Sequence, residues 1–74
     1  SQAYPARLSV FGVKLFSAGK LAGARSETTQ DVAAGTFRKL FYDDSNRLIG
    51  CILVGDLREA VKLQSQIIPV RERA

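Results

Sequence analysis

The sequence predicts a small α+β domain, in which a mainly antiparallel sheet of three to five strands carries one helix near the C-terminus. Two patterns predict this class: a β-hairpin over about residues 36–54, and an amphipathic helix that follows it over about residues 57–68. The third observation is the length. The 74 residues suffice for one domain, and their composition, 46% hydrophobic and 24% charged, is that of a chain that folds.

The hairpin is the clearest element. Residues 47–55 read RLIGCILVG and are apolar or small at both alternating sets of positions, which is typical of a strand covered on both faces. Residues 36–42 read TFRKLFY and favour a second strand. The polar residues 43–46 between them predict a tight turn, because short polar side chains bond to nearby backbone. Gly50 indicates a β-bulge or a close packing contact in mid-strand.

The helix is expected to follow this strand directly. Asp56 can act as its N-cap and Glu59 can complete a capping box, while Pro69 should end the helix because it has no amide hydrogen. Apolar residues recur at helical spacing on one face. That face comprises Leu57, Ala60, Val61, Gln64, Ile67 and Ile68. We expect the core to contain Leu40, Ile49, Ile52, Leu53, Val61 and Ile67.

The first half of the chain is less regular. Alternation over residues 8–10 and 13–16 predicts two short strands, or one strand with a bulge at Gly12. We expect a turn at residues 17–20, an edge strand at residues 25–30 and a turn at residues 33–35.

The residue types leave few options for chemistry. Histidine is absent, which removes the commonest general base at neutral pH, and one cysteine with carboxylates makes an implausible zinc site. No dinucleotide-binding, P-loop or zinc motif is present. Cys51 lies within the buried strand, where a thiol is inert, and Asp43 and Asp44 lie in a solvated turn. We therefore predict no catalytic, cofactor-binding or metal-binding residue in this chain.

The charge is positive, with eleven basic and seven acidic residues and a formal net charge of +4. This balance suits an acidic partner or nucleic acid, and equally a solvated basic surface. Phe37 to Tyr42 interleave basic and aromatic residues as in proteins that bind single-stranded nucleic acid, although core packing explains the pattern better. No apolar run approaches the roughly 20 residues of a membrane span. The single cysteine indicates a reducing compartment, so we expect the protein to be cytoplasmic.

Three segments resemble the C-terminal module of a known family. Residues 10–19, VFGVKLFSAG, are similar to its opening V-x-G-(V/I)-x-(L/V)-F-S-A-G. The pair FRKL at 37–40 and NRLIG at 46–50 is similar to its Y-(R/K)-K-L and (N/D)-R-L-(V/I)-G hairpin, and LVGD at 53–56 to its L-(V/Y)-G-D strand exit. The family comprises FAD-dependent, NAD(P)H-linked reductases of the rubredoxin reductase and assimilatory nitrite reductase type. It belongs to the pyridine nucleotide-disulfide oxidoreductase superfamily, and the resemblance spans residues 8–68.

The resemblance implies that residues 1–74 are a single domain, the excised non-catalytic C-terminal domain of a larger electron-transfer flavoenzyme. It implies that two other domains of the same polypeptide bind FAD and NAD(P)H. This domain then packs near the flavin and helps form the surface that docks an acidic electron-transfer protein or a fused redox domain. The disulfide reductases of the superfamily carry a catalytic histidine in this domain, and this chain has none. Lys14, Lys20 and Arg25 flank the FSAG segment and are our candidates for docking an acidic acceptor.

Two other function classes remain open on the sequence alone. One is a free-standing protein-interaction domain whose exposed edge strand pairs with a partner. The other is a nucleic-acid-binding module that uses the basic hairpin, with Phe37 and Lys39 at its centre.

Overall fold

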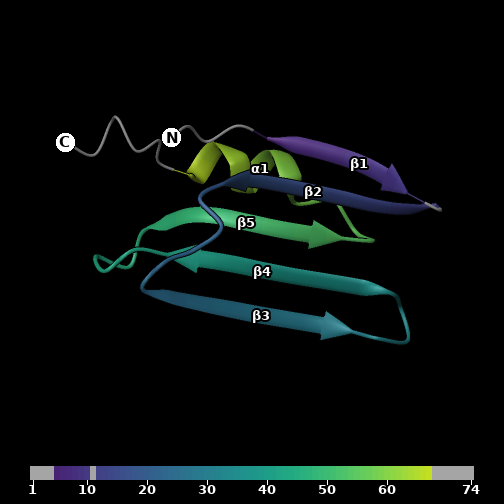
Figure 1. Ribbon diagram of the computed structural model, residues 1–74, viewed down its shortest axis with the longest axis horizontal. Coiled ribbons are helices and arrows are strands. Elements are labelled where there is room, and N and C mark those ends of the chain that lie inside the picture. Colours follow the sequence, from purple (N-terminus) through teal and green to yellow (C-terminus); the bar gives the residue numbers. More distant parts are fainter. Residues whose placement is uncertain (1–4, 11, 68–74) are drawn as a thin grey trace.

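The computed structural model describes residues 5–10 and 12–67, in which five strands form one antiparallel sheet and one helix covers one of its faces (Figure 1). The strand order across the sheet is β1-β2-β5-β4-β3, so β1 and β3 are the edges. The α+β class predicted from the sequence is thereby confirmed. The elements are β1 (Ala6–Val10), β2 (Val13–Gly19), β3 (Arg25–Asp31), β4 (Thr36–Tyr42), β5 (Leu48–Val54) and α1 (Ala60–Gln66).

The predicted hairpin is confirmed as β4 and β5, although β5 begins one residue later than expected. The reason is that Arg47 belongs to the turn: its backbone carbonyl accepts the N–H of Asp43 at 3.0 Å. The Asp43 carboxylate in turn accepts the backbone N–H groups of Ser45 and Arg47, each at 2.9 Å. Asn46 completes the turn with φ of 65°, a conformation that asparagine tolerates better than most residues.

Gly50 lies both beside a β-bulge and at a close packing contact, the two features that its place in mid-strand indicated. The register of β4 against β5 shifts after Phe41, which lies opposite Gly50, while Tyr42 lies opposite Leu48. Ile49 is therefore the extra residue of a bulge. A Cβ atom on Gly50 would also overlap the backbone carbonyl of Lys20. This carbonyl belongs to the connection from β2 to β3, which crosses β5 and β4 at one end of the sheet (Figure 1).

The segment over residues 6–19 forms two strands, β1 and β2, rather than one strand with a bulge. Val10 lies opposite Val13, and Gly12 has φ of 79° in the turn between them. The predicted edge strand is confirmed as β3, and the predicted turn at residues 33–35 lies within the turn at 32–35. The predicted turn at residues 17–20 is wrong, because residues 17–19 continue β2 and pair with β5.

The helix begins later than the sequence predicted. Asp56 accepts the backbone N–H of Arg58 at 3.0 Å, so it stabilises a turn ahead of the helix rather than the helix itself. Glu59 occupies the N-cap position without a side-chain cap hydrogen bond, so the predicted capping box is wrong. Its carboxylate binds Arg38 of β4 instead, at 2.7 Å. The helix ends at Gln66, with Ile67 as C-cap, and the predicted stop at Pro69 lies outside the described residues.

The core lies between α1 and the sheet. Of the predicted core residues, Leu40, Ile49, Leu53 and Ile67 are buried. The prediction that Val61 lies in the core is wrong: its side chain is 74% exposed, because the helix turns a different set of side chains toward the sheet. Ile52 is half-buried on the face of the sheet opposite α1. The cluster consists of Phe16, Ala18, Leu40, Cys51, Leu53, Ala60, Leu63 and Ile67.

Candidate interaction surfaces

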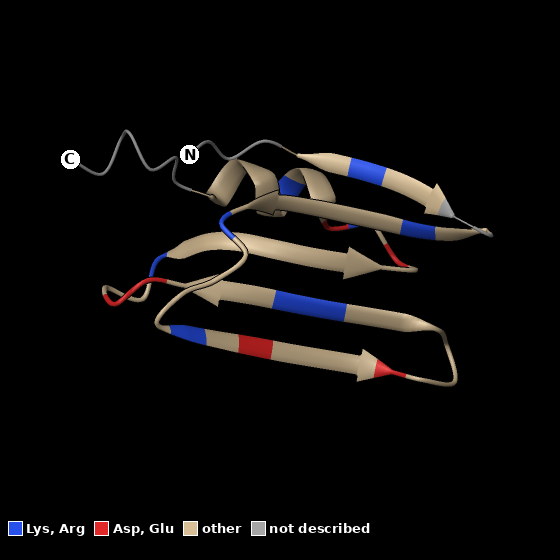
Figure 2. Cartoon of the chain, viewed as in Figure 1, with Lys and Arg blue, Asp and Glu red and all other residues tan. Residues whose placement is uncertain are grey.

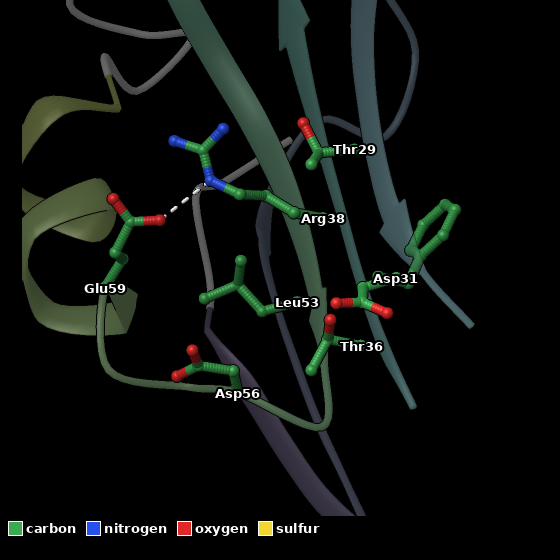
Figure 3. A pocket seen from close by; sticks show the side chains of 8 residues that line it. Thr29, Asp31, Thr36, Arg38, Leu53, Asp56 and Glu59 are labelled. Carbon is green, nitrogen blue, oxygen red and sulfur yellow. Dashed lines mark hydrogen bonds and ion pairs between the residues drawn. The ribbon is translucent and has the colours of Figure 1, made fainter. Parts of the chain in front are cut away.

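A pocket of about 120 Å³ lies beside the loop that leads from β5 into α1 (Figure 3). Three carboxylates, from Asp31, Asp56 and Glu59, line it together with the guanidinium of Arg38 and the side chain of Leu53. The acidic groups come from three places, namely the end of β3, the loop after β5 and the residue before α1. The pocket therefore forms only when the hairpins and the helix are assembled.

The charged groups of this pocket are already engaged within the chain. Glu59 binds Arg38 at 2.7 Å, and Asp56 binds the guanidinium of Arg58 at 2.7 Å. The hydrogen bonds from Arg58 hold the pKa of the Asp56 carboxyl down at about 2. Asp31 accepts the backbone N–H of Ala34 at 3.1 Å in the turn after β3. These contacts hold two turns and attach α1 to β4.

The pocket does not fit a dinucleotide cofactor. Sites for small molecules usually enclose about 300–1,000 Å³, and the carboxylates here would repel a pyrophosphate. Across residues 5–10 and 12–67, no group of three or more cysteine and carboxylate side chains is placed to hold a metal ion. Cys51 is fully buried in β5, and this burial raises the pKa of its thiol.

The three basic residues proposed for docking lie at two ends of the sheet. Lys14 is near the start of β2, and Lys20 directly follows its last residue, about 20 Å away along an extended strand. Lys20 lines a shallow depression that also contains Asp43 and Asp44. Figure 2 shows basic and acidic residues spread over several elements of the chain.

Arg25, the third of these residues, is held by neighbouring side chains. Its guanidinium lies 4.1 Å from the centre of the Tyr42 ring and binds Glu27 at 2.7 Å. It also donates to the side-chain oxygen of Asn46, which ties β3 to the β4–β5 turn.

The aromatic residues of β4 pack within the domain. Phe41 is buried, Phe37 is half-buried, and the ammonium of Lys39 lies 5.4 Å from the centre of the Phe41 ring. These positions agree with the packing interpretation of the interleaved pattern.

The surface that the sequence did not single out is an apolar stripe across the face of the sheet opposite α1. Leu8, Leu15, Val54 and Phe37 lie directly opposite one another across β1, β2, β5 and β4, and we call this row the apolar stripe. Leu8 is 56% exposed and the other three are half-buried. The sequence did hint at this surface, because β5 is apolar at both alternating sets of positions and therefore predicted packing partners on both faces of the sheet. In the described part of the chain, the single helix covers only one of them.

The comparisons with known proteins give one finding. The family model described as the rubredoxin NAD+ reductase C-terminal domain matches residues 5–69. The comparisons with curated proteins and with solved structures gave no match. No helix among the described residues has the length and hydropathy needed to cross a membrane.

Proposed function

The chain belongs to the family of rubredoxin NAD+ reductase C-terminal domains, and we propose that it is the non-catalytic C-terminal domain of an NAD(P)H-dependent FAD oxidoreductase. The parent enzyme is of the rubredoxin reductase or assimilatory nitrite reductase type. Other domains of the same polypeptide bind FAD and NAD(P)H, and this domain packs near the flavin and helps form the surface that docks the electron acceptor.

The apolar stripe is the observation that carries this proposal. A row of four apolar side chains across four strands is unusual on a face of a small domain that meets only water, and such patches mark surfaces for other proteins or domains. Val13, on the same face and 49% exposed, extends the row. The stripe therefore suits a permanent neighbour, such as the cofactor-binding domains of the same polypeptide.

The stripe can be tested in the complete reductase that contains this chain. Val54 lies at its centre, between Leu15 and Phe37, so Val54→Lys places a charge where the neighbouring domain packs. We expect the variant reductase to lose flavin and to be cut by protease between its domains faster than the unmodified enzyme. The control is Ala34→Lys, which adds the same charge in the exposed turn between β3 and β4, outside the apolar stripe.

Two results would count against the proposal. The first is a Val54→Lys reductase with unchanged flavin content and unchanged resistance to protease. The second is an open reading frame in which the chain is not joined to any dinucleotide-binding domain. Thermal unfolding of the 74-residue Val54→Lys chain separates lost packing between domains from lost stability of the domain itself.

For the docking of an acidic acceptor, the candidates remain Lys14, Lys20 and Arg25. Because Lys14 is about 20 Å from Lys20, they contact different parts of an acceptor rather than one acidic group. Neutralising all three is expected to weaken binding of the acceptor at low salt and to flatten its dependence on salt. Unchanged binding in the triple variant would remove these residues from the docking surface.

A further inference from the structure

Among the residues that the structure describes, strand β3 has no partner strand along its outer edge. It runs over seven residues, Arg25–Asp31, pairs with β4 on one side only, and is exposed along its whole length. Every residue of β3 lies opposite a residue of β4 without a shift in register. The pairing of β3 with β4 therefore has no bulge, and the outer edge of β3 presents backbone N–H and C=O groups to solvent.

Strand β3 lacks several of the usual protections of an edge strand, although it carries the charged residues Arg25, Glu27 and Asp31. Natural edge strands often carry proline, lysine or a bulge, each of which prevents another strand from pairing with them. The sequence of β3, RSETTQD, has neither proline nor lysine, and its pairing with β4 is regular. This edge is thus open to the addition of a strand whose charges complement those of β3.

The sequence of β3 is complementary to itself in one antiparallel register. When two copies pair about a twofold axis at Thr28, the arginine at one end of each strand faces the aspartate at the other end of its partner. Opposite-charge pairs across strands stabilise a sheet, and polar pairs at the remaining positions can hydrogen-bond. The pairs are Arg25 with Asp31, Ser26 with Gln30, and Glu27 with Thr29, each formed twice.

The neighbouring registers are disfavoured by charge. Pairing about Glu27 places two copies of this carboxylate directly opposite each other. Pairing about Thr29 places Glu27 opposite Asp31 twice. Like charges at facing positions destabilise a sheet, so the register about Thr28 is selected over both of its neighbours.

The side chains at the two ends are arranged for this contact. Arg25 is held in place by Tyr42 and Glu27 and still has 42% of its side chain exposed. Asp31 makes a single hydrogen bond, to Ala34, and has no ion-pair partner among the side chains that the structure describes. In the register about Thr28, the Asp31 carboxylate of one copy therefore faces the Arg25 guanidinium of the other, which neighbouring side chains already hold in place.

We propose that two copies of this chain associate through β3, in an antiparallel pairing centred on Thr28, to form one continuous sheet. The contact is isologous, since both copies use the same strand. It leaves both the α1 side and the apolar stripe free, so it is compatible with the proposed packing against cofactor-binding domains and does not depend on it. A single pair of strands buries little area, and we expect a weak dimer with a dissociation constant in the range of about 0.1–1 mM.

Charge exchange tests the register directly. Sedimentation equilibrium of the 74-residue chain measures association, and Arg25→Asp and Asp31→Arg are each expected to weaken it at least about tenfold, because each places like charges opposite each other twice. An equimolar mixture of the two variants restores every opposite-charge pair in a heterodimer, and the double variant restores them in a homodimer. Both are expected to recover association. Arg7→Asp, a matched change on the other edge strand, should have no effect.

The recovery distinguishes this interface from damage to the fold. If the single variants associate poorly and the mixture does not recover, the register about Thr28 is wrong. A chain that stays monomeric at about 1 mM, or whose association ignores both single variants, also overturns the proposal. Chemical-shift changes on dilution should be confined to residues 25–31, and changes centred on the apolar stripe would assign the contact to that surface instead.

Discussion

Asp56 shows how a residue outside the helix positions it. Its carboxylate accepts the backbone N–H of Arg58 at 3.0 Å and binds the Arg58 guanidinium, which orients the turn from β5 into α1. The hydrogen bonds from Arg58 lower the pKa of Asp56 to about 2. Since the folded-state pKa lies below the ordinary value of 3.8, the carboxylate stabilises the fold above pH 3.8. This contribution is lost as the pH falls toward 2.

We therefore expect the Asp56 carboxyl to titrate near pH 2 when it is followed by NMR. In the Arg58→Ala variant its pKa should rise toward the ordinary value, because the side-chain donor is gone. Lys62→Ala removes a positive charge from the exposed side of α1 and is the control, with no change expected at Asp56. If Asp56 titrates at its ordinary pH in the unmodified protein, the ion pair with Arg58 does not persist in solution.

A comparison of Gly19 with Gly35 distinguishes the cost of backbone strain from the cost of steric overlap. Both have left-handed backbone conformations, with φ of 74° and 69°. A Cβ atom on Gly19 would overlap the carbonyl of Ile49 and lie 3.0 Å from the side chain of Ile67, whereas nothing lies within 4 Å of one on Gly35. The same substitution at the two positions therefore differs mainly in packing.

Chemical denaturation should rank the two alanine variants clearly. Gly35→Ala is expected to lower the free energy of unfolding by about 1–2 kcal/mol, the cost of a left-handed conformation for a residue with a Cβ atom. Gly19→Ala should lose roughly 1–3 kcal/mol more, because β5 and the end of α1 must both move away from the added methyl group. Equal losses would mean that neither β5 nor the end of α1 packs closely against Gly19.

At the scale of elements, α1 is attached to the sheet by one face. Ala60 and Leu63 of the helix and its C-cap Ile67 are buried, while Val61 is 74% exposed. The Arg38–Glu59 ion pair at 2.7 Å fixes the beginning of the helix against β4, but both side chains are more than a third exposed, so we assign it a small contribution.

Two alanine variants of α1 test this orientation. Leu63→Ala should lower the free energy of unfolding by about 2–5 kcal/mol, as removal of a buried leucine side chain usually does. Val61→Ala should change it by less than about 0.5 kcal/mol, because the side chain is exposed. The sequence alone placed Val61 in the core, so the opposite ranking would support that original placement of the helix face and contradict the structure. Urea denaturation of both variants measures the difference.

The elements that the sequence predicted well are those with local signals. The β4–β5 hairpin has alternating apolar residues around a polar turn, and β3 has the polar composition of an edge strand. The start predicted for α1 was wrong because Asp56 and Glu59 have the spacing of a capping box but do not form one. Glu59 instead binds Arg38, a residue 21 positions away, and no local pattern reveals that contact.

At the scale of the molecule, the strand order explains why the candidate surfaces were harder to predict than the elements. β5 is the last of the described strands along the chain but lies at the centre of the sheet, between β2 and β4. This pairing of β2 with β5 brings Leu8 and Leu15 into line with Val54 and Phe37. The apolar stripe is thus assembled from residues up to 46 positions apart, although the two apolar faces of β5 did indicate that it needs cover on both sides.

The same order predicts a gradient of stability across the sheet. β5 has a partner strand on each side and carries the fully buried Cys51 and the buried Leu53, while β3 has one partner strand and no buried side chain. Amide hydrogens of β5 should exchange only through global unfolding, and those of β3 through local opening of the edge. We expect the β5 amides that bond to β2 or β4 to be the slowest in the domain. The β3 amides that bond to β4 should exchange at least about tenfold faster.

Hydrogen exchange followed by NMR at low protein concentration measures this gradient without interference from pairing of β3 with a second copy. Raising the concentration into the millimolar range should slow exchange in β3 alone, because the proposed dimer supplies its missing neighbour. The rates in β5 should stay constant, since global unfolding already limits them. Uniform rates across all five strands at low concentration would instead mean that the sheet opens only as a unit, and that its edges are as stable as its centre.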